Sequence, residues 1–274
     1  MLIYNALIAL PFRRTLVVSA CAGLALFAAR RAEANPRSLP FTYPYATLSE
    51  GQAELEQAVD LTPLRYVAET GDVPWEPRYK LQTEFEYGIS DRLELGLYLQ
   101  FSQGPGSPLG FDGVKQRLRL RFAEAGDWPV DVAVYAELAE LRGELELEQK
   151  LILEKTFGHL QITTNLWFEQ EFEQYTGEII PIANPTLGAS YQITPTFRAG
   201  VEYWMRAVLK SGEPGEDNFN AEPHHFVGPA LALVWGKLWW SAAAYARLDQ
   251  MDRPVYPGDM FGHVWVRSVI GLSL

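Results

Sequence analysis

From residue 52 onward, the chain alternates apolar and polar residues with a period of two in one segment after another. In the stretch "EFEYGISDRLELGLYLQF", residues 84–101, Phe85 and Tyr87 share one parity before a short polar break at Ile89-Ser90-Asp91. After the break, one face carries Leu93, Leu95, Leu97, Leu99 and Phe101. A period of two is that of a β-strand, whose successive side chains point to opposite faces. The stretch therefore predicts an antiparallel hairpin.

The same pattern predicts about twelve strands in an all-β chain. The predicted strands are residues 52–60, 79–88, 92–102, 113–122, 130–140, 144–155, 159–168, 185–193, 197–206, 226–235, 238–247 and 263–274. Most of them are longer than a typical soluble strand of about 5–6 residues and match the ~9–11 residues of a tilted membrane strand. No amphipathic helix of convincing length interrupts the strands.

The connections between these strands alternate in length. The short ones are "ISD", "FGH", "TPT" and "GK", with "AEAGDWP" as the longest of this group. The long, polar ones are 61–78, 103–112, 169–184, 207–225 and 248–262, with the joint at Arg142-Gly143 as an exception. Such alternation is typical of outer-membrane barrels, which have short periplasmic turns and long external loops. We therefore expect a single antiparallel, up-and-down transmembrane β-barrel in the bacterial outer membrane.

The apolar faces agree with a lipid-facing surface. Outward aromatic residues concentrate near predicted strand ends: Tyr87, Phe122, Tyr191, Phe197, Trp235 and Trp240 near the short turns, and Phe101, Phe168 and Tyr203 near the long loops. Two aromatic belts are expected where a barrel crosses both headgroup regions. The alternative is a soluble barrel or sandwich that holds the same residues in its core; strand length and the N-terminus favour the membrane.

The N-terminus has the features of a secretory signal. Arg13-Arg14 precede the apolar run "TLVVSACAGLALFAA", and Ala32-Glu33-Ala34 supplies small residues at a cleavage site. Lipidation at Cys21 is the alternative, because Val18-Ser19-Ala20-Cys21 resembles a lipobox. The expected organisation is a signal peptide at 1–34, an N-terminal periplasmic extension at 35–50 and the barrel at 51–274.

The net charge and the cysteine content exclude some classes of partner and of site. The formal charge is −11, and residues 1–34 carry four arginines and one glutamate, or +3, which leaves −14 on residues 35–274. This balance argues against nucleic acid, whose phosphates bind clustered Lys and Arg. The single cysteine excludes an internal disulfide framework and a cysteine metal cluster. The partners we expect are the lipid bilayer with lipopolysaccharide, the barrel assembly machinery and small solutes.

The hairpins "FEYGISDRLELGLYLQF" and "GASYQITPTFRAGVEYWM", together with the signal and the closing strand, resemble Gram-negative outer-membrane barrels. The resemblance is greatest to the transporter-like group that includes the phenol-degradation MetA-pathway proteins. It implies a barrel whose last strand is read by the assembly machinery and usually ends on an aromatic residue. Here Leu274 ends "HVWVRSVIGLSL" in place of that aromatic residue.

The inward parity is densely charged and supplies the candidate lumen residues. Strand 113–122 presents a basic ladder of Lys115, Arg117, Arg119 and Arg121. The other candidates are Glu84, Glu86, Glu94, Glu137, Glu144, Glu146, Glu148, Arg198, Glu202, Arg247 and Arg267. These charges predict either a polar conduit that selects solutes or a braced, closed wall.

We therefore expect a narrow porin-like or transporter-like conduit. A structural or adhesive barrel with a plugged lumen is the alternative, and an outer-membrane enzyme is a more distant one. His224-His225 lie in an acidic loop with Glu213, Glu216, Asp217 and Glu222. The two interpretations are a metal site and solvated residues, of which the second is the simpler. The sequence assigns no catalytic residue, no cofactor and no metal ligand.

Overall fold

The computed structural model describes residues 36–209, 223–249, 252, 254–257 and 259–274. The expected signal at 1–34 and the acidic loop residues Glu213, Glu216, Asp217 and Glu222 lie outside the described residues. Within the described part, no helix is long and apolar enough to span a membrane.

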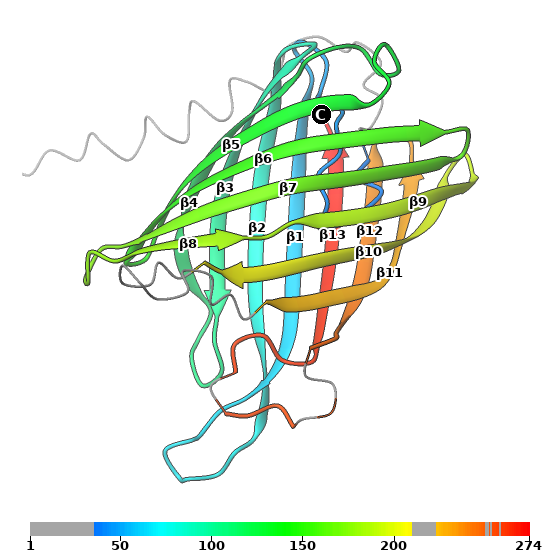
Figure 1. Cartoon of the computed structure of the whole chain (residues 1–274). Coiled ribbons are helices and arrows are strands. Elements are labelled where there is room, and N and C mark those ends of the chain that lie inside the picture. Colours follow the sequence, from blue (N-terminus) through cyan, green and yellow to red (C-terminus); the bar gives the residue numbers. More distant parts are fainter. Residues whose placement is uncertain (1–35, 210–222, 250–251, 253, 258) are drawn as a thin grey trace, which may run out of the picture.

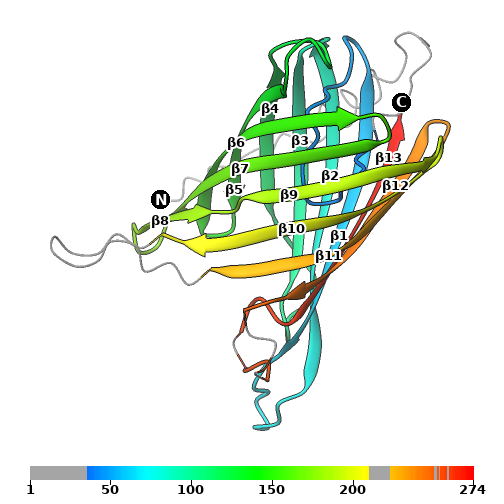
Figure 2. The ribbon, with the colours of Figure 1, turned by 45° about the vertical axis from the view of Figure 1, so that its right-hand side comes forward.

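The described residues form one antiparallel sheet that closes on itself (Figure 1). Its strands are β1 (Ala53–Arg65), β2 (Trp75–Ser90), β3 (Leu93–Gln103), β4 (Gly110–Arg121), β5 (Asp131–Leu141), β6 (Glu144–Phe157), β7 (Leu160–Glu173), β8 (Ile179–Ala183), β9 (Thr186–Thr194), β10 (Phe197–Val208), β11 (His224–Trp235), β12 (Leu238–Arg247) and β13 (Val264–Ser273). β1 pairs with β13 and closes the barrel. Figure 2 shows the same barrel turned about the vertical axis.

The predicted twelve-strand barrel is confirmed, with one strand broken in two. β8 and β9 both pair with β7 on one side and β10 on the other, so the two together fill one position in the wall. The break falls at Asn184-Pro185, and Pro185 has no N–H to donate to a ladder. β8 lies in a stretch that the sequence predicted to be loop, because Pro181 interrupts its apolar pattern.

The barrel has two different ends. The turns at 91–92, 158–159, 195–196 and 236–237 are two residues long, and the 122–130 connection joins them at what we call the short-turn end. The loops 66–74, 104–109 and 174–178 lie at the opposite end, which we call the long-loop end, with the short joint 142–143. At this end β10 ends and β11 begins, and β12 ends and β13 begins. Gly158 and Gly236 have φ of +61° and +63°, a conformation that suits glycine in such tight turns.

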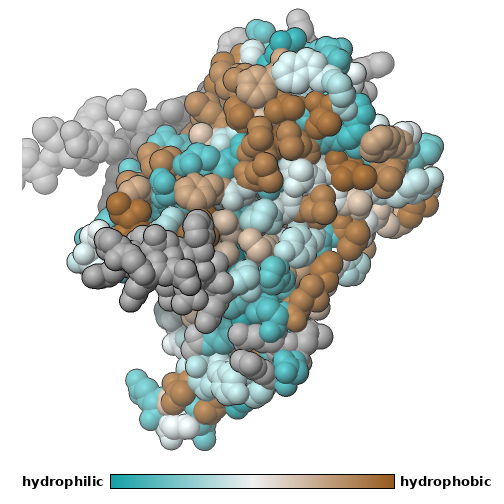
Figure 3. All heavy atoms as spheres, in the orientation of Figure 1, coloured by the Kyte–Doolittle hydropathy of each residue, from teal (hydrophilic) through white to brown (hydrophobic). Residues whose placement is uncertain are grey.

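The two faces of the wall differ as the parity predicted. Leu97 and Leu99 point outward and are 46% and 47% exposed, whereas Glu84 and Glu94 point inward and are 2% and 0% exposed. On the visible face, hydrophobic side chains gather over the strands (Figure 3). The outer surface is therefore apolar, as contact with lipid requires.

Candidate functional site

Arg117 is the centre of an ion-pair cluster in the lumen with three carboxylate partners. Its Nε lies 2.7 Å from Glu84 and its Nη1 2.6 Å from Glu94, while Nη2 pairs with Glu86. The Arg117 Nε also contacts the Tyr98 hydroxyl at 2.8 Å. The Arg117 side chain is 0% exposed, so the guanidinium is enclosed by its partners. This position braces neighbouring strands of the wall.

The other members of the basic ladder are also paired. Lys115 Nζ lies 2.9 Å from both Glu137 and Glu146, and Arg119 Nη2 lies 2.7 Å from Glu94. Both residues are buried inside the barrel.

Arg121 differs from the rest of the ladder, because it lies at the short-turn end. There it donates to the Asp91 carbonyl at 2.7 Å and pairs with Glu124 at 2.7 Å. The structure thus brings three of the four predicted basic residues into the lumen and places the fourth at its rim.

Two neighbouring strands carry an acidic wall. The ladder between β6 and β7 pairs Glu144 with Glu173, Glu146 with Glu171, and Glu148 with Glu169, all facing inward. Like charges directly opposite each other repel, so this wall needs cations.

Nearby basic side chains supply those cations. Lys150 pairs with Glu148, and Arg206 lies 3.1 Å from Glu169 and 2.5 Å from Glu171. Ligand oxygens of Glu144, Glu146 and Glu171 lie within 4.8 Å of one another, an all-oxygen set of the kind that hard cations prefer. Two of these three carboxylates, Glu146 and Glu171, already bind a basic side chain.

The remaining predicted lumen residues are spread around the wall. Arg267 lies 2.9 Å from Asp60, Arg198 donates to Ser190 at 3.0 Å, and Glu202 is fully buried on β10. Arg247 lies at the long-loop end, where it pairs with Asp249 at 3.0 Å and with Asp259 at 2.8 Å.

The histidines 224 and 225 do not converge on one site. They are neighbours on a strand and therefore face opposite sides of the wall. His224 contacts Asp249 at 3.0 Å and Arg247 at 2.8 Å, whereas His225 contacts the Tyr203 hydroxyl at 2.7 Å.

The sequence missed the most prominent content of the lumen, which is the segment 36–48. Residues 35–50 were expected to extend into the periplasm, but the described part folds into the barrel and is largely buried (blue in Figure 1). The reason is visible in "SLPFTYPY", where Leu39, Phe41, Tyr43 and Tyr45 alternate with small or polar residues. An extension in water would expose these rings, and burying them in the lumen is favourable. We call residues 36–48 the plug segment.

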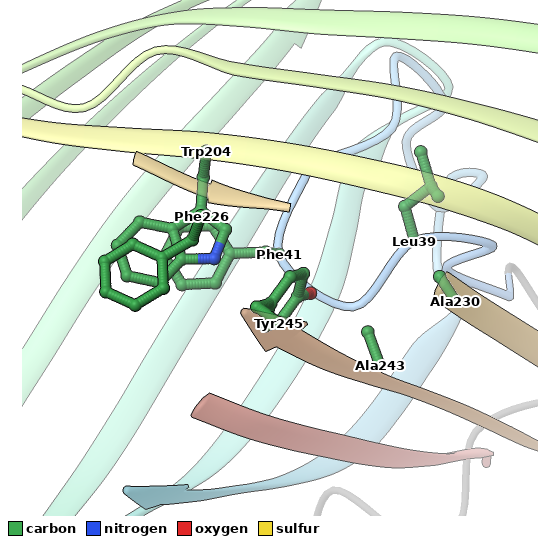
Figure 4. Packing of buried hydrophobic residues seen from close by; sticks show 7 residues of the cluster. All are labelled: Leu39, Phe41, Trp204, Phe226, Ala230, Ala243 and Tyr245. Atoms are coloured by element: carbon green, nitrogen blue, oxygen red, sulfur yellow. The ribbon is translucent and has the colours of Figure 1, made fainter. Parts of the chain in front are cut away.

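Wall side chains hold the plug segment by its backbone. Glu202 accepts the N–H groups of Phe41 and Thr42, Asn165 accepts that of Tyr43 at 2.8 Å, and Glu94 accepts that of Leu48 at 2.7 Å. Leu39 and Phe41 pack with Trp204, Phe226, Ala230, Ala243 and Tyr245 in the cluster shown in Figure 4.

Both ends of the plug segment are at the short-turn end. Thr47 donates to the Asp91 carbonyl at 3.0 Å, and Ser38 contacts Gln161, the second residue of β7, at 3.1 Å. Within the described part of the chain, residues 36–48 donate no backbone N–H to a backbone carbonyl of the wall. The segment could therefore leave without breaking the β-ladder.

Little free space remains beside the plug segment. Beside Arg37 and Tyr43 there is a cavity of about 10 Å³, about enough for one water. A separate hollow of about 790 Å³ lies at the long-loop end between β4, the β5–β6 joint, β7 and β8. It is on the outer face of the wall, because Leu145, Phe172 and Ile179 in its lining have the outward parity. Its lining is both apolar and charged, and includes Phe111, Glu140, Arg142, Phe172 and Glu178.

Comparisons place this architecture among known barrels. The chain is similar to the COG4313 outer membrane channel from Pseudomonas putida F1, with a TM-score of 0.57 and 11% identity over 84% of this chain and 98% of that one. The NanC porin has a TM-score of 0.49 and 8% identity over 81% of this chain and 98% of that one. No protein-family model and no curated protein sequence matches the chain. At such identities the first likeness concerns the fold alone, which is that of a closed antiparallel β-barrel.

Proposed function

We propose that the protein is an outer-membrane conduit for small solutes, with the short turns in the periplasm. The observation that carries the proposal is a closed barrel with an apolar exterior and a charged interior, stopped by a segment that is not part of its wall. A barrel that served only as a scaffold would not require a segment that fills its lumen without pairing with the strands of its wall. The lipid bilayer and lipopolysaccharide are the partners of its outer surface, and the assembly machinery is the partner of its closing strand.

The proposal is of transport and not of catalysis. His224 is bonded to Asp249 and Arg247, and His225 to a tyrosine hydroxyl, so neither contact activates a serine or cysteine nucleophile.

The conduit should favour cations modestly. Residues 35–274 carry 33 acidic and 19 basic residues, obtained by subtracting those of 1–34 from totals of 34 and 23. The acidic wall of β6 and β7 raises the local cation concentration in the lumen, and the surplus in the outer loops does so at the mouth. The enclosed Arg117 and the paired Lys115 oppose this preference only weakly.

Planar bilayer recordings test the proposal. We expect the intact chain to conduct little, and a variant that lacks residues 36–48 to show larger and longer openings with a reversal potential that indicates cation preference. The plugged, structural or adhesive barrel is favoured by the ion pairs that fill the lumen. A deletion variant that keeps the heat-sensitive gel mobility of a folded barrel but does not conduct would decide for that alternative.

A further inference from the structure

The ring of Phe41 lies in a slot that the wall has built for it. It stacks on Trp204 with centroids 4.7 Å apart and planes 15° apart, and Trp204 stacks in turn on Phe226 at 4.0 Å. The Arg267 guanidinium carbon lies 4.8 Å from the centroid of the Phe41 ring. Figure 4 shows the three rings overlapping, with Tyr245 beside them. Trp204 and Phe226 belong to the wall, so the aromatic surface stays in place if Phe41 leaves.

A buried carboxylate ends the slot. Glu202 is 0% exposed and accepts the Phe41 N–H at 3.0 Å, the Thr42 N–H, and the Tyr245 hydroxyl. Two of these three donors come from the plug segment. Without the segment, Glu202 would be a buried carboxylate short of donors, which is costly unless another donor replaces them.

The covalent structure of Phe41 sets the spacing between the aromatic slot and the Glu202 carboxylate. In Phe41 the ring is separated from the nitrogen that bonds Glu202 by two carbon atoms, Cβ and Cα. A free ligand with the same connectivity would present an ammonium group where Phe41 presents a neutral amide N–H. A charge-assisted hydrogen bond to a buried carboxylate is stronger than the neutral one that it replaces. Arg267 is already paired with Asp60 at 2.9 Å, so it adds little net repulsion.

We infer that the slot formed by Glu202, Trp204, Phe226 and Tyr245 recognises solutes in which two carbons join an aromatic ring to an ammonium group, and that Phe41 occupies it as an internal competitor. The inference rests on the proposed conduit, because a solute must reach the slot through the lumen. It assigns the plug segment a role beyond closure: the segment sets the apparent affinity for such solutes, which falls with the fraction of molecules whose slot is vacant.

Titration of the full protein in detergent with phenethylamine, followed by tryptophan fluorescence and calorimetry, tests the inference. We expect Phe41→Ala to bind on the order of tenfold more tightly than the unsubstituted protein, because the competitor is gone. Ethylamine lacks the ring and phenylacetate lacks the cation, and both should bind far more weakly. Phe41→Leu, which keeps apolar bulk on the segment, serves if Phe41→Ala does not fold.

Two control variants separate the slot from a general loosening of the plug segment. Tyr43→Ala removes a ring from the same segment but leaves Phe41 seated, so phenethylamine binding should stay at the unsubstituted level. Phe41→Ala combined with Glu202→Gln should lose the gain. An equal gain in Tyr43→Ala, or no preference for phenethylamine over ethylamine in folded Phe41→Ala, would overturn the inference.

The proposed conduit is tested separately from the slot. Binding in detergent requires no ion current. If phenethylamine binds but the protein does not conduct, the proposed conduit is refuted and the inferred slot stands. If Phe41→Ala conducts, but phenethylamine neither binds to it nor blocks its current, the proposed conduit stands and the inferred slot is refuted.

Discussion

At the scale of single residues, Arg117 shows how the interior charges act. Its guanidinium joins Glu84 and Glu94 and is fully enclosed. We expect Arg117→Gln to lower the free energy of unfolding by about 3–5 kcal/mol, because the loss of one member leaves buried carboxylates uncompensated. Ion preference should change little, because the guanidinium does not face free solution. The measurements are the temperature at which the folded gel band converts to the unfolded one, and the reversal potential.

Arg121→Gln is the matched control for Arg117→Gln. Arg121 lies on the same strand but pairs at the rim with Glu124, whose side chain is 52% exposed. An exposed pair of this kind contributes less than about 1 kcal/mol. If folded Arg117→Gln kept its stability and shifted the reversal potential further towards cations, the ladder would select solutes instead of bracing the wall.

Asp249, outside the strands at the long-loop end, gives a pH dependence. Burial raises the pKa of Asp249, but hydrogen bonds from the His225 backbone N–H, His224 and Arg247 outweigh it and leave the pKa below its ordinary value. A carboxylate with a lowered folded pKa stabilises above the unfolded pKa of about 3.9, and the contribution is lost as pH falls through the folded pKa. Asp249→Asn should cost about 1.5–3 kcal/mol at neutral pH.

The difference between Asp249→Asn and the unsubstituted protein should shrink as the pH falls below about 4. The measurement is the temperature at which the folded gel band converts to the unfolded one, taken across a pH series. Asp252→Asn, an exposed position in the same loop, is the control and should follow the unsubstituted protein at every pH. A constant difference down to low pH would mean that the contacts of Asp249 do not depend on its charge.

At the residue scale, parity predicted which side chains face inward but not which of them meet. Gly96 illustrates the limit, because a Cβ there would lie 2.6 Å from the Arg117 Nε. Gly96 and Arg117 are opposite each other in the ladder between β3 and β4. That register depends on turn lengths and a bulge near Gln100, which the alternation alone does not specify.

At the scale of elements, β9 and the plug segment are in close contact. Gly188 faces inward, and a Cβ added there would overlap the Leu39 side chain. Gly188→Val should therefore push the segment outward by overpacking, at about 1–3 kcal/mol, or about 5- to 150-fold in the population of displaced segment. We expect a higher open probability in bilayers and faster proteolysis of the N-terminal segment.

Ala189→Val is the control for Gly188→Val, because the neighbouring residue points to the outer face of the same strand. It should leave both the current and the proteolysis unchanged. Equal effects of the two substitutions would show that β9 itself had been disturbed and not its contact with Leu39.

The sequence predicted the regular elements and missed the irregular ones. β1 runs to Arg65 and β2 begins at Trp75, beyond the predicted ends, because Pro63 and Pro77 interrupt the pattern yet lie opposite each other in the ladder. β8 and the plug segment were missed for related reasons. In β8, Pro181 interrupts the alternation that would have predicted a strand. The plug segment bonds to side chains of the wall and not to a neighbouring strand.

At the scale of the whole molecule, the two ends of the barrel predict its orientation. An epitope inserted at Gly71, in the 66–74 loop, should be accessible to antibody on intact cells, whereas one inserted at Pro195 should be accessible only after the outer membrane is permeabilised. Both proteins should fractionate with outer membranes and migrate faster unheated than boiled. Surface labelling at Pro195 and not at Gly71 would invert the assignment, and recovery in the soluble periplasm would contradict the membrane barrel.

The position of the plug segment also has a consequence for the order of events during biogenesis. Phe41 precedes the first strand, yet its slot is made by Trp204, Phe226 and Tyr245 on β10, β11 and β12. The seam between β1 and β13 closes just as late, since the bond from Ser273 to Glu54 spans 219 positions of the chain. The earliest part of the described chain must therefore wait, with its rings unburied, until nearly all of the strands exist. A nascent chain in transit across the periplasm would carry "LPFTYPY" as an exposed apolar stretch, which is the kind of segment that periplasmic chaperones shield.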